Sequence, residues 1–192
     1  MRLSVPRVLR LVSLVSSVRN RLLNALARVF TGKSLALDWR GIKIFNPQAM
    51  QIGDYFSSGP GLWLESVGGK GRLVIGNRVN FSNDVHVGCA YMVTIGDGVL
   101  VGSKVLITDH SHGEIDARGP REAHLAPNER TITSKGGVSI GADVWLGDGV
   151  CVLPGVTIGA GAIIGANSVV IRDVPAGAVW AGVPARQIWP RG

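Results

Sequence analysis

Residues 140–170 read IGADVWLGDGVCVLPGVTIGAGAIIGANSVV, and here an aliphatic side chain recurs every six residues, in most cases followed by glycine. The same step continues upstream wherever no insertion intervenes. The aliphatic-glycine pairs are Ile52-Gly53, Ile75-Gly76, Val87-Gly88, Ile95-Gly96, Val101-Gly102, Ile140-Gly141, Leu146-Gly147, Ile158-Gly159 and Ile164-Gly165, with Phe81, Ile107, Val152 and Val170 at the missing steps. Internal repetition at this period is typical of a parallel β-helix.

The six-residue period has a simple physical meaning. Each hexad supplies a short strand and a tight corner, so three hexads close a triangular coil with one inward aliphatic side chain on each face. We expect the glycine to allow corner conformations that a side chain would penalise. Stacked coils then bury a continuous column. The second inward position is small or β-branched, at Val79, Val85, Val99, Val105, Val144, Val150, Val156, Ala162 and Ser168.

The length of 192 residues and the 46% hydrophobic content suit one folded domain with an appendage. We predict a basic amphipathic helix and linker over residues 1–40, a β-helix over 41–187 and a tail over 188–192. Residues 113–139 lack the repeat and form a long excursion loop. The fold class is therefore all-β with one N-terminal helix.

The charge is unevenly distributed. Residues 1–37 hold seven basic residues and no acid, whereas the remainder holds 13 of each sign, so the whole net charge of +7 lies in the N-terminal fifth. The neutral body lacks the basic stripe of a nucleic-acid-binding protein. Cys89 and Cys151 have no paired spacing, which fits a reducing compartment and predicts a cytoplasmic protein.

Residues 6–30 have apolar side chains close to a helical period. Arg10, Arg19 and Arg21 interrupt every window that approaches the roughly 20 apolar residues of a membrane span. The ALA sequence at 25–27 resembles a signal-peptide cleavage site, but Arg19 and Arg21 lie where the apolar region should continue. The helix either packs on its own domain or a neighbouring subunit, or lies on an anionic membrane, and these alternatives are compatible.

The hexads, together with VWLG at 144–147, LPGVTIG at 153–159 and IRDVPAGAVWAGVPAR at 171–186, resemble the left-handed β-helix acyltransferases of the hexapeptide-repeat superfamily. The likeness covers about residues 50–187 and is greatest to galactoside, maltose and polysaccharide or lipopolysaccharide O-acetyltransferases. The resemblance implies left-handed coils, an exception to the usual crossover rule. It also implies a homotrimer that binds acetyl-CoA between adjacent subunits.

The repeat breaks at ITDHSHGEIDA, residues 107–117, and a long loop begins there. A long loop in a compact solenoid is usually functional. In the sugar acetyltransferases a catalytic histidine ends this hexad, and an ungapped count places His112 there. His110 fits with a two-residue gap. Either imidazole would act as a general base on a sugar hydroxyl, unless it is only a surface residue at a corner. Asp109 would orient the imidazole or cap the turn. Gly113 replaces the proline that follows the histidine in the sugar enzymes.

Other site residues follow from the resemblance. The acceptor-binding asparagine of the galactoside enzymes matches Ser82, with Asn83 adjacent and Asp84 and His86 in the same hexad; structural capping is the alternative for all four. For acetyl-CoA, the small residues Gly147, Gly165 and Ala166 would let the pantetheine arm approach the backbone. Trp145 would wall the thioester end, and Arg172 and Arg186 would contact phosphates or form a solvated edge.

These residues predict an acetyl-CoA-dependent O-acetyltransferase acting on a sugar of a cell-surface glycan or its precursor, without a metal. The alternative is a zinc-dependent carbonic anhydrase, another trimeric β-helix enzyme, with His86, His110 and His112 as ligands. The H-S-H spacing departs from the H-x4-H of that family. A catalytically silent scaffold is a third possibility.

Overall fold

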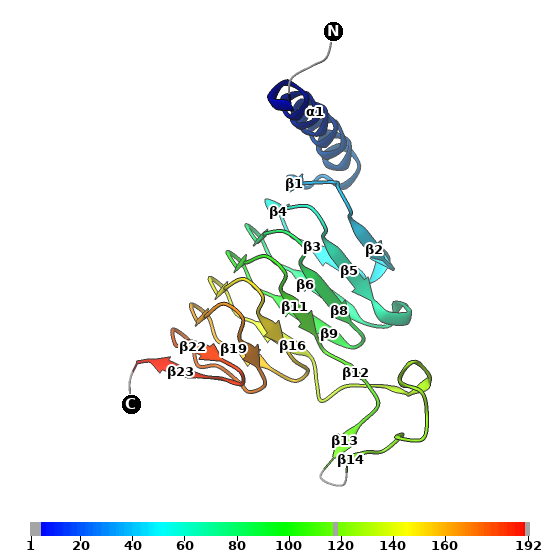
Figure 1. Cartoon of the computed structure of the whole chain (residues 1–192), viewed down its shortest axis with the longest axis vertical. Coiled ribbons are helices and arrows are strands. Elements are labelled where there is room, and N and C mark those ends of the chain that lie inside the picture. Colours follow the sequence, from blue (N-terminus) through cyan, green and yellow to red (C-terminus); the bar gives the residue numbers. More distant parts are fainter. Residues whose placement is uncertain (1–4, 117–118, 191–192) are drawn as a thin grey trace.

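The computed structural model describes residues 5–116 and 119–190, with side chains from residue 12 onward except that of residue 115. One helix, α1 (Val5–Thr31), precedes a β-solenoid of about seven turns. Figure 1 shows the stacked coils, with α1 beyond one end and the excursion loop projecting from the side. The predicted all-β fold with an N-terminal helix is confirmed.

The coils stack into three sheets, one on each face of the prism. Their strands are parallel except for the last pair, β22 and β23. Sheet A contains β1 (Leu35–Leu37), β4 (Phe56–Ser58), β7 (Asn80–Phe81), β10 (Leu100–Val101), β17 (Trp145–Leu146), β20 (Ile163–Ile164), β22 (Val179–Gly182) and β23 (Ala185–Trp189). Sheet B contains β2 (Lys43–Phe45), β5 (Trp63–Ser66), β8 (His86–Cys89), β11 (Leu106–Thr108), β18 (Cys151–Val152) and β21 (Val169–Val170). Sheet C contains β3 (Met50–Ile52), β6 (Arg72–Ile75), β9 (Met92–Ile95), β16 (Val138–Ile140) and β19 (Thr157–Ile158).

The hexad positions form the core as the repeat predicts. Register pairs Ile52 with Ile75, Ile75 with Ile95 and so on to Ile158, so one inward residue of each coil contacts its equivalent in the next. All nine predicted second inward residues are buried. The β-helix also begins before the expected boundary at residue 41, because β1 pairs with β4 and buries Leu37.

The repeated glycines have a different role from the one expected. A Cβ on Gly141 would lie 2.5 Å from the amide nitrogen of Ala160 in the next coil, and a Cβ on Gly53 would lie 2.5 Å from the carbonyl carbon of Gly76. The left-handed backbone falls two residues later instead, for example at Asp143, with φ of 56°. The glycine is therefore needed for close stacking of coils.

The excursion loop leaves the coil slightly earlier than the sequence indicates. β12 (Ser111–His112) pairs antiparallel with β15 (Ile132–Thr133), so these two segments form the stem of the loop. The coil resumes by Val138, which pairs with Val93. Beyond the stem are β13 (Ile115–Asp116), β14 (Gly119–Pro120) and the 3-10 helix η3 (Pro127–Glu129). Two further 3-10 helices, η1 (Pro47–Ala49) and η2 (Val67–Gly69), follow strands of sheet B.

Candidate functional site

The predicted site residues lie along two of the corners between sheets. At one corner of each coil the chain passes from sheet A to sheet B. We call this corner "edge AB"; it consists of residues 82–84, 102–104, 147–149 and 165–167. The corner from sheet B to sheet C is edge BC, made of residues 89–91, 109–110, 153–155 and 171–173. Sheet B separates the two edges within one chain.

Asp109 is the most firmly held polar residue of edge BC. Its side chain is fully buried, and its carboxylate accepts hydrogen bonds from the backbone amides of Ala90, Tyr91 and Met92 at 2.7–2.8 Å. Burial alone would raise the pKa of this carboxyl, but hydrogen bonds from His110 and these amides outweigh that effect and lower it. Asp109 is therefore an ionised anchor between two coils.

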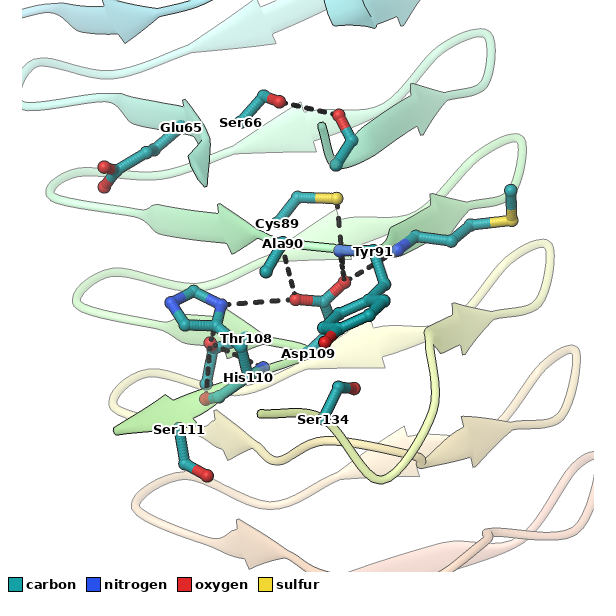
Figure 2. A network of polar contacts seen from close by, with 12 residues as sticks. Glu65, Ser66, Cys89, Ala90, Tyr91, Thr108, Asp109, His110, Ser111 and Ser134 are labelled. Carbon is teal, nitrogen blue, oxygen red and sulfur yellow. Dashed lines mark hydrogen bonds and ion pairs between the residues drawn. The ribbon is translucent and has the colours of Figure 1, made fainter. Parts of the chain in front are cut away.

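His110 follows directly and points back toward the preceding coil (Figure 2). Its Nδ1 lies 3.2 Å from Oδ1 of Asp109 and 3.2 Å from Oγ1 of Thr108, and its side chain is only 15% exposed. An ionised carboxylate can only accept a hydrogen bond, so this contact favours the tautomer that carries its proton on Nδ1 and leaves Nε2 proton-free. The geometry thus prepares His110 to accept a proton. The Asp109 carboxylate thus contacts both the imidazole of His110 and the backbone amides of the turn at residues 90–92.

His112 lies in a different environment. It belongs to β12, is exposed, and pairs through its backbone with Ile132 on the stem of the excursion loop. The structure therefore brings His110, rather than His112, into the side-chain network of edge BC. The ungapped count favours His112 because it treats the stem residues as part of the coil.

His86 lies near His110 on the outer surface of sheet B. A Cβ on Gly88 would lie 3.1 Å from Cε1 of His110 and 3.7 Å from Nε2 of His86, so the bare glycine leaves space between the two rings. The His86 ring stacks on Trp63 at 4.0 Å, and its Nε2 lies 3.9 Å from Oε2 of Glu65.

The surroundings of His86 favour a neutral imidazole. Burial lowers its pKa, the charges of His110 and Lys43 lower it further, and Glu65 partly opposes them. Nε2 is buried without a hydrogen-bond partner among the described residues. His86 thus offers an unused polar atom beside Gly88.

The other predicted acceptor residues lie elsewhere. Ser82, Asn83 and Asp84 belong to edge AB, at the start of β8, whereas Gly88 and His110 lie at the opposite end of sheet B. Their backbones bond to Val101, Lys104 and Pro60. Within one chain, these three residues are not brought next to His110.

Four of the six predicted acetyl-CoA residues line one cavity on edge AB. This cavity has a volume of about 330 Å³ and is lined by Trp145, Gly147, Asp148, Ile163, Ile164, Gly165 and Ala166. Trp145 is 51% exposed and forms part of its wall. A Cβ on Gly147 would lie 2.7 Å from the amide nitrogen of Ala166, so this glycine is required by coil stacking as well as by any ligand.

The two predicted phosphate contacts do not line this cavity. Arg172 is exposed on edge BC, directly after β21. Arg186 is exposed in β23, on sheet A beyond β20 and β22, and its guanidinium donates to the carbonyl of Ala185 at 2.8 Å. In one chain, only Arg186 shares a sheet with the cavity.

Two further cavities lie at the root of the excursion loop. One has a volume of about 660 Å³ and is lined by Val67, Gly68, Lys70, Ala90, Tyr91, Met92 and Ile132. The other, of about 360 Å³, shares Tyr91 and Ile132 and adds residues of both strands of the stem. The loop thus encloses space beside the turn that Asp109 anchors.

A zinc site of the predicted alternative kind is not assembled within the described part of the chain. Residues 5–116 and 119–190 contain no group of three or more His, Cys, Asp or Glu side chains arranged to hold a metal ion. His86 and His110 border Gly88, but His112 lies on the loop stem.

Sequence reasoning missed Trp63, Glu65, Gly88 and Thr108 as members of this site. Each occupies an ordinary hexad position, and parallel pairing alone aligns Glu65 with Gly88 and Gly88 with Thr108. Gly88 was noted only as part of the repeat. The available signal is the stacking register, which aligns outward residues of successive coils.

Comparison with known proteins identifies the family of this chain. The family model "Bacterial transferase hexapeptide (six repeats)" matches residues 137–172. WbbJ of Escherichia coli (strain K12), assigned as an O-acetyl transferase of lipopolysaccharide biosynthesis, is 42% identical over 146 residues, covering 76% of this chain and 74% of WbbJ. Galactoside O-acetyltransferase of the same strain is 42% identical over 98 residues, or 51% of this chain and 44% of that enzyme.

A solved structure shows the same relationship. A hexapeptide-repeat acetyltransferase of Vibrio cholerae O1 biovar eltor, in complex with acetyl coenzyme A, is 28% identical with a TM-score of 0.52, covering 78% of this chain and 70% of that chain. The repeated coils, the sequence identity with WbbJ and this structural likeness lead to one assignment. This chain belongs to the hexapeptide-repeat acetyltransferase superfamily.

Proposed function

We propose that this chain is an acetyl-CoA-dependent O-acetyltransferase that modifies a sugar hydroxyl of a cell-surface polysaccharide, a lipopolysaccharide or a precursor of either. The identity with WbbJ supports the substrate class. The observation that carries the chemistry is the contact of Nδ1 of His110 with the buried, ionised Asp109.

In the proposed reaction His110 is the general base. As the acceptor hydroxyl attacks the thioester carbonyl carbon of acetyl-CoA, a C–O bond forms and the hydroxyl proton passes to Nε2 of His110. The C–S bond then breaks, and the thiolate of coenzyme A takes a proton from the imidazolium. The charge of Asp109 stabilises the imidazolium between these steps. Such a base contributes roughly a hundredfold to ten-thousandfold in rate.

We assign this role to His110 in preference to His112. His110 is largely buried and has a carboxylate that sets its tautomer, while His112 is exposed on the loop stem. His86 borders the same space at Gly88 with its side chain 32% exposed, so the accessible part of its ring would face the acceptor sugar.

Direct transfer, without an acyl-enzyme, agrees with the state of the nearest thiol. Burial, aided by the charge of Asp109, raises the pKa of Cys89 to about 12. A thiol with this pKa is protonated at neutral pH, and the thiolate is the nucleophilic form. We place the reaction in the cytoplasm, where acetyl-CoA is available and Cys89 and Cys151 stay reduced.

We further propose that acetyl-CoA binds along edge AB and that the chain acts as a homotrimer. The cavity lined by Trp145, Gly165 and Ala166 would hold the pantetheine arm, and Arg186 lies farther along the same sheet. Within one chain, sheet B separates this cavity from His110. In the trimer, edge BC of one copy, with His110, would therefore lie against edge AB of the next copy, with the cavity. A neighbouring copy would then face each of the remaining predicted residues, Ser82, Asn83, Asp84 and Arg172.

The activity is tested with purified protein, acetyl-CoA and a panel of sugars and glycan fragments, following release of the coenzyme A thiol. We expect acceptor-dependent release that is lost in His110→Ala and kept in His124→Ala, a matched change on the excursion loop. Absence of release with every acceptor, together with stoichiometric zinc that is lost in His86→Ala, would overturn the proposal in favour of the zinc enzyme.

The shared site is tested by complementation. His110→Ala removes the base from edge BC, and Ala166→Trp fills the cavity on edge AB, so each variant alone should be inactive. If neighbouring copies share a site, co-expressed and co-purified mixtures should regain activity, because some interfaces combine an intact His110 with an intact cavity. Mixed oligomers that remain as inactive as either parent would show that each site lies within one chain.

A further inference from the structure

The helix α1 is attached to the β-helix by its polar side. The side chain of Asn24 donates to the carbonyl of Leu37 at 3.0 Å and accepts from the amide of Leu37 at 3.1 Å and from Nε1 of Trp39 at 2.9 Å. Asn20, one turn earlier, accepts from the amide of Trp39 at 3.3 Å. The helix therefore covers the end of β1 with asparagines, which satisfy backbone groups at this end of the solenoid.

The apolar side of α1 faces away from its own domain. The side chains of this exposed stripe are 47% to 79% exposed, which is unusual for such large aliphatic residues. The stripe consists of Val12, Val15, Val18, Leu22, Leu26 and Val29. Its members follow one another at intervals of three or four residues, so they form one continuous face. None of the described residues covers this face.

The charge beside the exposed stripe indicates what covers it. Arg21 and Arg28 are both exposed and lie seven residues apart along one margin of the stripe. Residues 1–37 contain no acid. Helices of two copies packed by this face would bring arginines together without the carboxylates that pair such charges in coiled coils. Anionic lipid headgroups supply the missing negative charge.

The shape of the helix agrees with a position in the plane of a membrane. No helix within the described residues is both long enough and apolar enough to cross a bilayer. A broad apolar face with arginines at its side is typical of a helix that lies in the headgroup region with its apolar side chains among the acyl chains. In Figure 1, α1 lies beyond β1 at the end of the solenoid, away from the excursion loop.

We infer that the exposed stripe of α1, flanked by Arg21 and Arg28, docks this protein on an anionic lipid bilayer. The docking does not depend on acyl transfer, so it stands or falls separately from the proposed enzymatic activity. It would also hold the protein at a surface where membrane-bound acceptors are found.

The full-length protein is tested by flotation with vesicles of phosphatidylcholine alone and of equal parts phosphatidylcholine and phosphatidylglycerol. We expect binding to the anionic vesicles that weakens as salt is added. Arg21→Gln combined with Arg28→Gln should weaken binding about 30-fold, because each basic residue contributes about 1 kcal/mol at an anionic surface. If the parent protein binds both vesicle types equally, or binds neither, the inference is overturned before any variant is tested.

The apolar contribution is tested with Leu22→Ser combined with Leu26→Ser. The matched control is Ile171→Ser combined with Ile188→Ser, which removes comparable exposed side chains from the β-helix. The α1 variant should lose vesicle binding while its oligomeric mass in lipid-free buffer stays that of the parent, and the control should bind normally. If the α1 variant instead dissociates into smaller species, the stripe is covered by a second copy and the membrane inference is wrong.

Discussion

Oδ1 of Asp109 lies 3.2 Å from Nδ1 of His110, and the same carboxylate accepts hydrogen bonds from three backbone amides of the preceding coil. One buried charge therefore fixes the corner of one coil and the imidazole of the next. This arrangement links the stability of the β-helix to the geometry of the proposed base.

His110→Ala should lower kcat by roughly a hundredfold to ten-thousandfold while leaving the KM for acetyl-CoA nearly unchanged, because a general base acts on the chemical step. His112→Ala should have a much smaller effect. Steady-state kinetics with a saturating acceptor separates the two, with His124→Ala as the control for surface histidines. A larger loss of kcat in the His112 variant would reverse the assignment.

Asp109→Asn should lower the free energy of unfolding by about 1 to 3 kcal/mol at neutral pH, because an amide cannot accept all the hydrogen bonds that the carboxylate accepts. The pKa of Asp109 is lowered in the folded protein, so its ionisation contributes stability fully above the ordinary value of 3.8. That contribution is lost as the pH falls through the folded pKa. The difference in the free energy of unfolding between the parent and the variant, measured by urea unfolding, should therefore narrow below about pH 4. A difference that stays constant in acid would contradict this.

Gly88→Ala should reduce kcat roughly three- to tenfold, because small displacements of a reacting group have large effects on rate. The added Cβ would lie 3.1 Å from Cε1 of His110, and the backbone of Gly88 is compatible with alanine, so the ring should move while the fold remains. Activity measured beside the thermal unfolding curve tests this. A large fall in melting temperature, or unchanged kcat, would show that this space is not used.

Trp145→Ala should raise the Kd for coenzyme A about two- to tenfold, the usual contribution of an aromatic contact. The indole forms part of the wall of the edge AB cavity. Isothermal titration measures the Kd, and Tyr55→Asn is a suitable control, since it removes an exposed aromatic ring far from the cavity at a position with positive φ that asparagine tolerates. Equal effects in both variants would argue against the cavity as the donor site.

Asn24→Ala should release α1 from the β-helix. The change removes three hydrogen bonds to Leu37 and Trp39, each worth about 1 kcal/mol. Hydrogen exchange should quicken in α1 while the coils stay protected. Ser17→Ala, an exposed change on the same helix, should leave exchange unaltered. If the coils lose protection together with α1, the helix is an integral part of the solenoid core.

The repeat alone was sufficient to predict the coils, the buried columns and the position of the excursion loop. The inward residues of each hexad are set by a local period, and no distant contact is needed to recognise it. These features depend on residues a few positions apart. The resemblance to the hexapeptide-repeat acyltransferases, and not the repeat itself, groups Trp145, Gly147, Gly165 and Ala166, which line one cavity in the structure.

Three features needed the tertiary structure. The preference for His110 over His112 depends on where the chain leaves the coil, which is decided by pairing of β12 with β15 some 20 residues away. The role of the repeated glycines depends on how closely coils stack. The exposed side of α1 depends on the asparagines that bind β1 and its neighbours. A periodic sequence specifies which side chains share a face, but which face meets another part of the molecule depends on long-range contacts that periodicity does not encode.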